Sequence, residues 1–272
     1  MSGPPFDGLE ASLWERARAA PSRLLALDYD GTLAPFTVDP AAARPHPGAR
    51  RALERIARDG RTSVAILSGR PPAEIVRLLG NLAVPIVGEH GWTTRFPDGG
   101  ILRRPIDPEL DRLLDRAQAD LEHAVAPARI ERKRSSVVVH TRGLPQVLAR
   151  SAERRARSVV AQRHEDERLE LRPIDGGLEL RLAGHDKGGA LVELLEPLGP
   201  GAFPVVVGDD DTDEDAFRAA LAHGGTGIRV GAGRPSAAPS RLSSPDEVAL
   251  FLCAWSEQVD GSGAHAPESP DG

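Results

Sequence analysis

The sequence predicts an α/β fold built on a parallel sheet, with an α+β segment inserted into it. Short apolar runs alternate with helix-like stretches near both ends of the chain. A segment in which long charged stretches predominate separates these two regions. The apolar runs also end in acidic or hydroxyl residues, as parallel strands do where they open into a binding crevice. With 272 residues, the chain is long enough for one domain that carries an insertion.

The first half of the predicted core extends from residue 9 to residue 87. Residues 9–20 mix apolar and charged side chains, which is compatible with a short helix ended by Pro21. The compact apolar run over 23–27 is typical of a buried parallel strand. Prolines and glycines then mark the ends of the next predicted elements, which are a helix over 47–59, a strand over 62–67, a helix over 73–79 and a strand over 84–87.

The middle of the chain has a different pattern. Two long charged helices are predicted over 108–125 and 145–164, with strand-like runs over 136–141 and 178–182. The earlier alternation resumes with a helix over 187–198, a strand over 203–207 and a helix over 212–223. We therefore predict a core domain of residues 1–104 and 183–258, an inserted domain of residues 105–182, and a disordered tail of residues 259–272 rich in Gly, Ser and Pro.

Composition excludes several classes of function. The net charge of -6 and an aromatic content of 4% argue against nucleic-acid binding, which needs basic patches or stacking platforms. The single cysteine, Cys253, cannot form an internal disulfide or a thiolate metal cage. No apolar run approaches the roughly 18 residues of a membrane span, and acidic residues interrupt the first twenty positions, so no secretory signal is expected. We expect a cytoplasmic protein that contacts neither membrane nor nucleic acid.

Polar residues at the ends of the predicted strands should meet in one crevice, because ligands of open α/β sheets bind outside the carboxyl ends of the strands. These residues are Asp28 and Asp30, then Ser68, then Asp209, Asp210 and Asp213, with Lys187 opening the helix before the last strand. So many carboxylates in one crevice would repel each other unless a cation joined them. Mg²⁺ fits this oxygen-rich set, whereas the spacing from Asp209 does not match a calcium-binding EF-hand loop.

This set of groups suits phosphoryl transfer. A cation, a lysine and a hydroxyl can neutralise and position the phosphate oxygens. Asp28 could attack phosphorus to form an aspartyl phosphate. Asp30, two residues on and therefore on the same side of the strand, could serve as the general acid and base.

Each motif also has a purely structural interpretation when it is taken alone. The Asp28–Thr32 run could be a turn, and the acidic run from Asp209 could be a charged helix start. Ser68 could be a helix cap and Lys187 a solvated surface residue. Only their joint occurrence, in this order along the chain, favours a catalytic site.

Taken together, these motifs resemble those of the haloacid dehalogenase superfamily of phosphohydrolases. The run from Leu25 to Leu33, followed by Ser68, Lys187 and Gly208-Asp-Asp, is similar to the superfamily's four motifs in their order. The decapeptide from Gly208 to Phe217 resembles more narrowly the fourth-motif signature of the trehalose-6-phosphate phosphatase family. Further matches are Gly88-Glu-His-Gly91, Glu131-x-Lys133 and His140-x-Arg142, and the resemblance extends from about Arg23 to about Phe251.

The resemblance implies a Rossmann-like haloacid dehalogenase core with an inserted α/β cap of type C2. It implies a Mg²⁺-dependent hydrolysis of trehalose 6-phosphate, the last step of trehalose biosynthesis, and a trehalose-6-phosphate synthase of the same pathway as a protein partner. Asp28 would be the nucleophile and Asp30 the acid and base, and Ser68 and Lys187 would hold the phosphate. The Asp28 carboxylate, the Asp30 backbone carbonyl and Asp209 would bind Mg²⁺, supported by Asp210 and Asp213.

The family's sugar contacts carry over to Glu131, Lys133 and Glu179 in the inserted segment. Further candidate substrate contacts are Gly31, Thr32, Gly69, Arg70, His90, Gly91, His140 and Arg142. His140 is equally consistent with a scaffold role, because any half-buried strand alternates in this way. The sequence departs from the family pattern at Thr141, Glu89 and Trp92.

Two alternatives stay open from the sequence. The first is another capped sugar-phosphate phosphatase, acting for example on sucrose phosphate or mannosyl phosphoglycerate. The second is a Mg²⁺-dependent protein that binds a sugar phosphate without turnover and regulates a partner. An intact Asp28 and Asp30 argue against the second, because a binding protein needs no nucleophile beside an acid.

Overall fold

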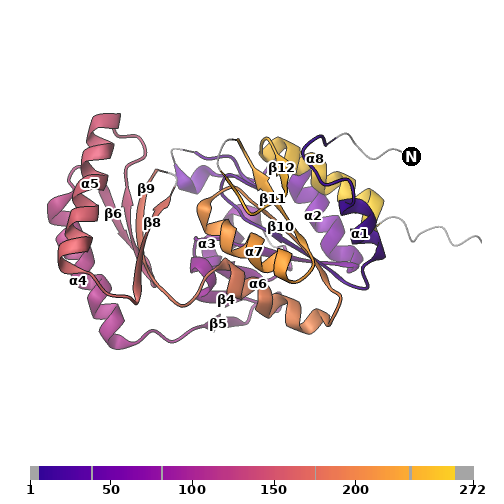
Figure 1. The fold of residues 1–272 in the computed structure, drawn as a ribbon, viewed down its shortest axis with the longest axis horizontal. Coiled ribbons are helices and arrows are strands. Elements are labelled where there is room, and N and C mark those ends of the chain that lie inside the picture. Colours follow the sequence, from indigo (N-terminus) through magenta and orange to yellow (C-terminus); the bar gives the residue numbers. More distant parts are fainter. Residues whose placement is uncertain (1–5, 38, 81, 175, 233–234, 261–272) are drawn as a thin grey trace, which may run out of the picture.

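Two lobes of unequal size make up the computed structural model of the protein (Figure 1). The structure describes residues 6–260, except 38, 81, 175, 233 and 234. The larger lobe contains a sheet of eight strands and the smaller lobe a sheet of four. Within the described part of the chain, no helix is long and apolar enough to cross a membrane.

The larger sheet has the strand order β12-β11-β10-β1-β2-β3-β4-β5. Neighbours from β12 to β3 are parallel, whereas β4 and β5 are antiparallel additions at one edge. Its strands are β1 (Arg23–Leu27), β2 (Thr62–Leu67), β3 (Ile86–Gly88), β4 (Thr93–Arg95), β5 (Ile101–Arg103), β10 (Phe203–Gly208), β11 (Thr226–Val230) and β12 (Ser240–Leu242). Because β1 lies between β10 and β2, strand ends from distant parts of the sequence meet at one edge of the sheet.

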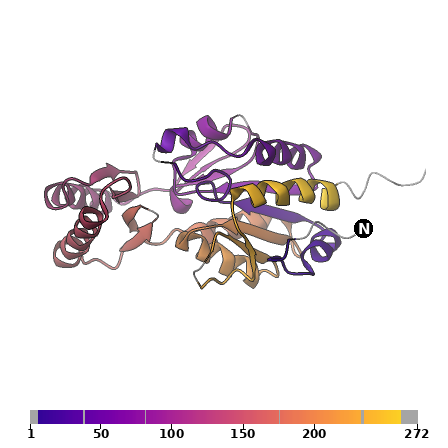
Figure 2. The same ribbon diagram turned by 90° about the horizontal axis from the view of Figure 1, so that it is seen from above.

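Helices cover both faces of this sheet, which explains why β1 is apolar from Leu24 to Leu27. Leu25 and Leu27 belong to one apolar cluster, with α1 (Leu13–Ala19), α2 (Pro47–Asp59), α3 (Pro72–Leu79) and α8 (Pro245–Trp255). Leu24 and Ala26 belong to a second cluster, with α6 (Lys187–Leu195) and α7 (Glu214–Ala222). In Figure 2 the orange helices α6 and α7 lie on the opposite side of the sheet from the yellow helix α8.

The smaller lobe is an antiparallel sheet with the order β6-β7-β9-β8. Its strands are β6 (Arg129–Arg132), β7 (Ser136–His140), β8 (Leu169–Ile174) and β9 (Gly177–Leu182), and the helices α4 (Pro108–Ala124) and α5 (Gln146–Arg163) cover one face. Val137 and Val139 face these helices and pack with Leu121 and Leu178. The register aligns Glu131, Val138 and Glu179 in a row on the other face.

The structure confirms the α/β class, the mostly parallel sheet and an inserted sheet of its own. The strands predicted over 23–27 and 62–67 and the helix predicted over 47–59 have the observed bounds. The helix expected over 9–20 begins only at Leu13, and the strand expected over 84–87 only at Ile86. The sequence did not predict the helix α8. It also did not predict the strands β4, β5, β6, β8, β11 and β12.

Short helical turns complete the described elements. The helix expected over 187–198 divides into α6 and a 3₁₀ turn, and the one expected over 212–223 starts with a 3₁₀ turn before α7. The short elements are the 3₁₀ turns η1 (Pro40–Ala42), η2 (Glu89–Gly91), η3 (Glu196–Leu198) and η4 (Asp211–Asp213), and the π-helical η5 (Ser256–Asp260). The tail expected to be disordered over 259–272 starts inside η5, where Val259 is buried, and residues 261–272 lie outside the described residues.

Candidate active site

Three carboxylates from two distant parts of the sequence meet at the carboxyl edge of the larger sheet. Asp28 follows β1, Asp209 follows the adjacent strand β10, and Asp213 lies in η4. Oxygen atoms of these three residues lie within 4.8 Å of one another. The convergence expected from the strand ends is therefore present, and the three oxygen ligands are close enough to share one cation.

The electrostatics of this cluster favour a bound cation. Burial, followed by the charge of neighbouring carboxylates, raises the pKa of Asp209 to about 9. Burial also raises the pKa of Asp28 to about 8, although Lys187 opposes this shift. Carboxylates with such raised pKa values are costly to ionise unless positive charge compensates them. Hard oxygen donors at this spacing suit a divalent cation such as Mg²⁺.

Lys187 supplies the first positive charge of the site. It occupies the first position of α6 and is buried, and its Nζ donates to Asp28 Oδ1 and Asp213 Oδ1, both at 2.7 Å. Burial alone would lower the pKa of this ammonium, but the two carboxylates outweigh burial and raise it. Lys187 thus stays charged and links the strand end of β1 to the loop after β10.

The loop after β10 is folded around the Asp213 side chain. Asp213 Oδ2 accepts hydrogen bonds from the backbone N–H groups of Asp209 at 3.0 Å and Asp210 at 2.9 Å. Gly208 permits this arrangement, since a Cβ there would lie 2.3 Å from Asp213 Cγ. Gly31 has φ +78°, and a Cβ there would lie 2.4 Å from Asp209 Oδ2. Both glycines therefore let backbone approach the carboxylates closely.

Asp30 is held apart from this cluster. Arg70 donates to both of its carboxylate oxygens, from Nε to Oδ2 and from a terminal nitrogen to Oδ1, each at 2.6 Å. The Arg70 backbone N–H in turn donates to Ser68 Oγ at 3.1 Å. The fork fixes the orientation of the Asp30 carboxylate, because a bidentate guanidinium pair constrains both partners.

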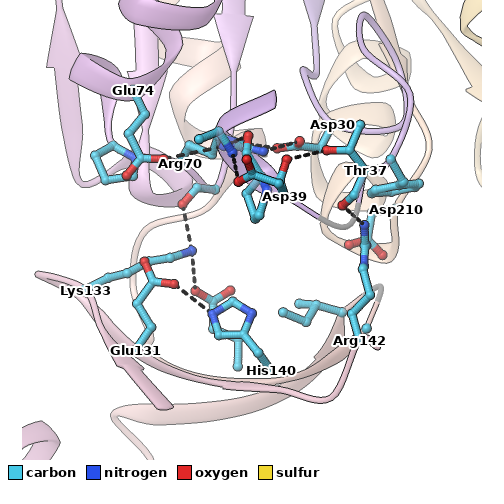
Figure 3. Close-up of a pocket in the computed structure, with 18 of the residues that line it drawn as sticks. Asp30, Thr37, Asp39, Arg70, Glu74, Glu131, Lys133, His140, Arg142 and Asp210 are labelled. Carbon is cyan, nitrogen blue, oxygen red and sulfur yellow. Dashed lines mark hydrogen bonds and ion pairs between the residues drawn. The ribbon is translucent and has the colours of Figure 1, made fainter. Parts of the chain in front are cut away.

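A cleft of about 1180 Å³ lies between the two lobes. Figure 3 shows Asp30, Arg70 and Asp39 on the side of the larger lobe, facing Lys133 and His140 on the smaller one. Asp28, Lys187 and Asp210 also line the cleft. A ligand in it would contact the carboxylate cluster at one end and the polar face of the smaller sheet at the other.

On the smaller lobe, Glu179 is the centre of a buried polar network. Its carboxylate accepts from Ser136 Oγ at 2.6 Å and from His90 Nε2 at 2.9 Å, and lies 3.6 Å from Lys133 Nζ. Burial opposes ionisation here, but the charges of His90 and Lys133 and the hydrogen bonds hold the pKa of Glu179 well below its usual range. Lys133 Nζ also donates to the Gly69 carbonyl at 3.2 Å, which joins the two lobes.

A second pair lies further out in the cleft. His140 Nε2 lies 2.7 Å from Glu131 Oε2, and this hydrogen bond is the main cause that lowers the pKa of Glu131 to about 2. Arg142 contacts the larger lobe, where it donates to the Thr37 carbonyl at 3.1 Å and lies over the Phe36 ring at 4.7 Å. Figure 3 shows Glu131 directed toward His140, and Arg142 directed toward Thr37.

The structure places most of the predicted site residues on the wall of one cleft. Those that line it are Asp28, Asp30, Gly69, Arg70, His90, Glu131, Lys133, His140, Arg142, Glu179, Lys187 and Asp210. Six others do not line the cleft but neighbour residues that belong to the site: Ser68 contacts Arg70, Thr32 Oγ1 lies 3.3 Å from Asp209 Oδ1, and Gly91 follows His90 in η2. Gly31 lies against Asp209, and Asp209 and Asp213 form the carboxylate cluster with Asp28. Their individual roles remain predictions.

Sequence reasoning missed two parts of the site. Phe36, Thr37 and Asp39 line the cleft from the loop that follows Asp30, and their position just after a strand end could have suggested this. Ser136, which holds Glu179, carries no signal of its own, because only the pairing of β7 with β9 brings the two together.

Fold and site together define a class. A Rossmann-like core, an inserted cap-like sheet, and an Asp-x-Asp strand end beside a lysine and an acidic loop are the features of the haloacid dehalogenase superfamily. More narrowly, the chain belongs to the trehalose-phosphatase family, whose sequence pattern matches residues 26–246.

Individual relatives agree with this assignment. The chain is 34% identical over 255 residues to the trehalose-phosphate phosphatase of Mycolicibacterium paratuberculosis, a match that covers 86% of this chain and 62% of the relative. It therefore spans about three-fifths of that curated relative's length. The structure of Aspergillus fumigatus trehalose-6-phosphate phosphatase is 28% identical with a TM-score of 0.67, covering 94% of this chain and 99% of the other.

A further structure supports the fold alone. The C-terminal domain of Candida albicans trehalose-6-phosphate phosphatase superimposes with a TM-score of 0.81 at 23% identity, and covers 96% of this chain and 98% of that domain. The two-lobed architecture is thus shared over nearly the whole chain.

Proposed function

We propose that this protein hydrolyses trehalose 6-phosphate to trehalose and inorganic phosphate. The observation that carries the proposal is the cluster of Asp28, Asp209 and Asp213 with Lys187, of which Asp28 and Lys187 line a cleft that also has polar residues of the smaller lobe on its wall. Membership of the trehalose-phosphatase family and relatives named for this activity support the choice of substrate.

In the proposed reaction, a carboxylate oxygen of Asp28 attacks phosphorus, and the bond from phosphorus to the sugar oxygen breaks. Asp30 gives its proton to that oxygen, so that trehalose leaves as a neutral alcohol. Water then attacks the aspartyl phosphate while Asp30 takes its proton, which releases phosphate and restores both carboxyl groups. Arg70, which donates to both Asp30 oxygens, would orient the ionised Asp30 carboxylate as it takes this proton.

Mg²⁺ is the proposed cofactor, held by the Asp28 carboxylate, the Asp30 backbone carbonyl and Asp209. When bound, it would neutralise negative charge on the phosphate and the surrounding carboxylates. Asp210 and Asp213 would support the site by ordering its loop, because the backbone N–H groups of Asp209 and Asp210 donate to the Asp213 side chain.

We further propose that residues 105–182 act as a cap that holds the sugar, over a core of residues 1–104 and 183–258. Ser68 and Lys187 would bind the phosphate, and Glu131, Lys133 and Glu179 would bind sugar hydroxyls. The row formed by Glu131 and Glu179 on the cleft side of the smaller sheet supports this role.

The test is phosphate release from a panel of sugar phosphates, with Mg²⁺ and with excess chelator. We expect release from trehalose 6-phosphate to exceed that from sucrose phosphate, mannosyl phosphoglycerate and glucose 6-phosphate, and to stop when Mg²⁺ is removed. Asp28→Asn should abolish release. Persistent activity of that variant would contradict the proposed chemistry, and preference for another sugar phosphate would contradict only the substrate.

A further inference from the structure

The loop after β10 concentrates more negative charge than the proposed reaction uses. Five carboxylates lie between residues 209 and 214, and their order in the chain is Asp209, Asp210, Asp211, Asp213 and Glu214. One of these side chains, Asp209, is a proposed cation ligand, and Asp213, which supports it, is already paired with Lys187. Like charges so close together would push the loop apart unless further positive charge held it.

A buried ion pair lies directly behind this loop. Arg229, on β11, is 4% exposed, and Glu214, at the start of α7, is 9% exposed. One terminal nitrogen of Arg229 donates to Glu214 Oε1 at 2.8 Å. Glu214 also accepts from Ser236 Oγ at 2.6 Å and from the Ala237 N–H at 2.8 Å. Both oxygens of this buried carboxylate are therefore satisfied.

The same arginine reaches the loop itself. Its terminal nitrogens lie 3.5 Å from the Asp210 carbonyl oxygen and 3.5 Å from Asp211 Oδ1. Arg229 thus contacts the chain on both sides of η4, while Lys187 contacts Asp213 from the cleft. The acidic loop lies between two buried cations, one in the site and one behind it.

We infer that Glu214 and Arg229 are positioning residues that hold the acidic loop, with the ligand Asp209 and the supporting Asp213, in the geometry needed to bind the cation. This inference rests on the cation site of the proposed function. A metal site tolerates displacements of only about 0.5 Å, and changes to the groups that orient its ligands typically weaken metal binding by about 10- to 100-fold. Glu214 fixes the arginine, and the arginine fixes the loop.

Three substitutions disturb the pair of Glu214 and Arg229 to different degrees, and a fourth serves as a control. Glu214→Gln keeps the size and most hydrogen bonds but leaves Arg229 without its counter-charge. Arg229→Lys keeps the charge but removes the fork that spans two contacts. Ser236→Ala removes one hydrogen bond and is the mildest change. Asp120→Asn is the matched control, since it breaks contacts to Arg163 and His164 in the smaller lobe, away from the loop.

The experiment measures Mg²⁺ binding to the full chain by calorimetry without substrate, together with the melting temperature in chelator. We expect Kd for Mg²⁺ to rise about tenfold or more in Glu214→Gln and Arg229→Lys, and less in Ser236→Ala. The Mg²⁺ concentration for half-maximal activity should shift by the same factor, with KM for the substrate unchanged at saturating Mg²⁺. Asp120→Asn should lower the melting temperature while keeping the wild-type Kd.

Two results would overturn the inference. One is a folded Glu214→Gln or Ser236→Ala variant that melts earlier but binds Mg²⁺ as the wild type does, since the pair would then be merely structural. The other is no Mg²⁺ binding by the wild type. Failure of the proposed function would look different: Mg²⁺ would bind, with the expected losses in the variants, yet no sugar phosphate would release phosphate.

Discussion

The carboxylates of the two lobes differ in how their charge is balanced. In the larger lobe, burial and mutual repulsion raise the pKa of Asp28 to about 8 and that of Asp209 to about 9. In the smaller lobe, the hydrogen bond from His140 lowers the pKa of Glu131 to about 2. Glu179 is buried as deeply as Asp28, yet His90 and Lys133 hold its pKa well below the usual range.

Asp28 and Glu179 are both buried, so the opposite shifts of their pKa values follow from their neighbours. The larger lobe gathers several carboxylates around one lysine, so negative charge exceeds positive charge and a further cation is favourable. On the smaller lobe, Glu131 and Glu179 each have a hydrogen-bonding partner, which is His140 for Glu131 and His90, from the larger lobe, for Glu179. The first arrangement suits a metal and a phosphate, and the second suits neutral hydroxyl groups that exchange hydrogen bonds without changing net charge.

The variant Asp209→Asn should give the largest effect, and it tests whether the carboxylates of the larger lobe carry unbalanced negative charge. We expect phosphate release to fall about a thousandfold, because a metal ligand is lost. The melting temperature in chelator should rise, because a repelled carboxylate has been removed, and Mg²⁺ should no longer raise it. Phosphate assays and thermal melts with and without Mg²⁺ measure both effects. A lower melting temperature in chelator would show that the charge of Asp209 is already balanced.

Glu179→Gln tests the other half of the contrast. Here the melting temperature should fall, since the variant removes a satisfied buried carboxylate and leaves His90 and Lys133 without a counter-charge. KM for trehalose 6-phosphate should rise by about 10- to 100-fold, with a smaller loss in kcat, because a hydroxyl contact is lost. Glucose 6-phosphate, which lacks the second sugar, serves as the comparison substrate. An unchanged KM would place Glu179 outside the sugar site.

Much of the core could be predicted because its local signals agree with its tertiary environment. The strand Arg23–Leu27 is apolar on both faces, and the helix Pro47–Asp59 starts at a proline and ends before Gly60, so their bounds follow from the sequence. The strand Ile101–Arg103 is short and exposed throughout, so no alternation of buried and exposed residues marks it. The helix Pro245–Trp255 has a usable sequence signal, the Ser244 cap, although no helix is predicted there above.

For the site, the sequence predicts which residue types meet but not how they pair. The order of motifs brings Asp28 and Asp209 together, because parallel strand ends share one edge of the sheet. The fork between Arg70 and Asp30 depends on side-chain geometry across two loops, which no spacing encodes. The strand Thr226–Val230 was missed for a related reason: its buried Arg229 looks like a surface residue until Glu214 is placed beside it.

Asp30 is an exception to the contrast between the lobes, because this carboxylate of the larger lobe has a cationic partner of its own, Arg70. Arg70→Lys should lower kcat about tenfold with little change in KM, because a lysine cannot hold both Asp30 oxygens. Steady-state kinetics over a range of substrate concentrations separates the two constants. A rise in KM with unchanged kcat would instead make Arg70 a substrate contact, as the sequence-based prediction has it.

The smallest effect is expected at His140. The pKa of Glu131 is lower in the folded protein than in the unfolded chain, so this carboxylate stabilises the fold above its ordinary pKa and loses that effect as pH falls toward 2. Removing the hydrogen bond in His140→Gln should raise the pKa of Glu131 toward its ordinary value, which NMR titration of its carboxyl carbon measures.

The effect of this variant on stability should be small. The side chains of His140 and Glu131 are 26% and 32% exposed, so solvent screens the pair. We therefore expect a stability loss of only about 0.5 kcal/mol at pH 7, and a smaller one near pH 2. An unchanged Glu131 pKa would show that Lys133 and Arg129, and not His140, hold it down, and the charge balance of the smaller lobe would then belong to the sheet as a whole.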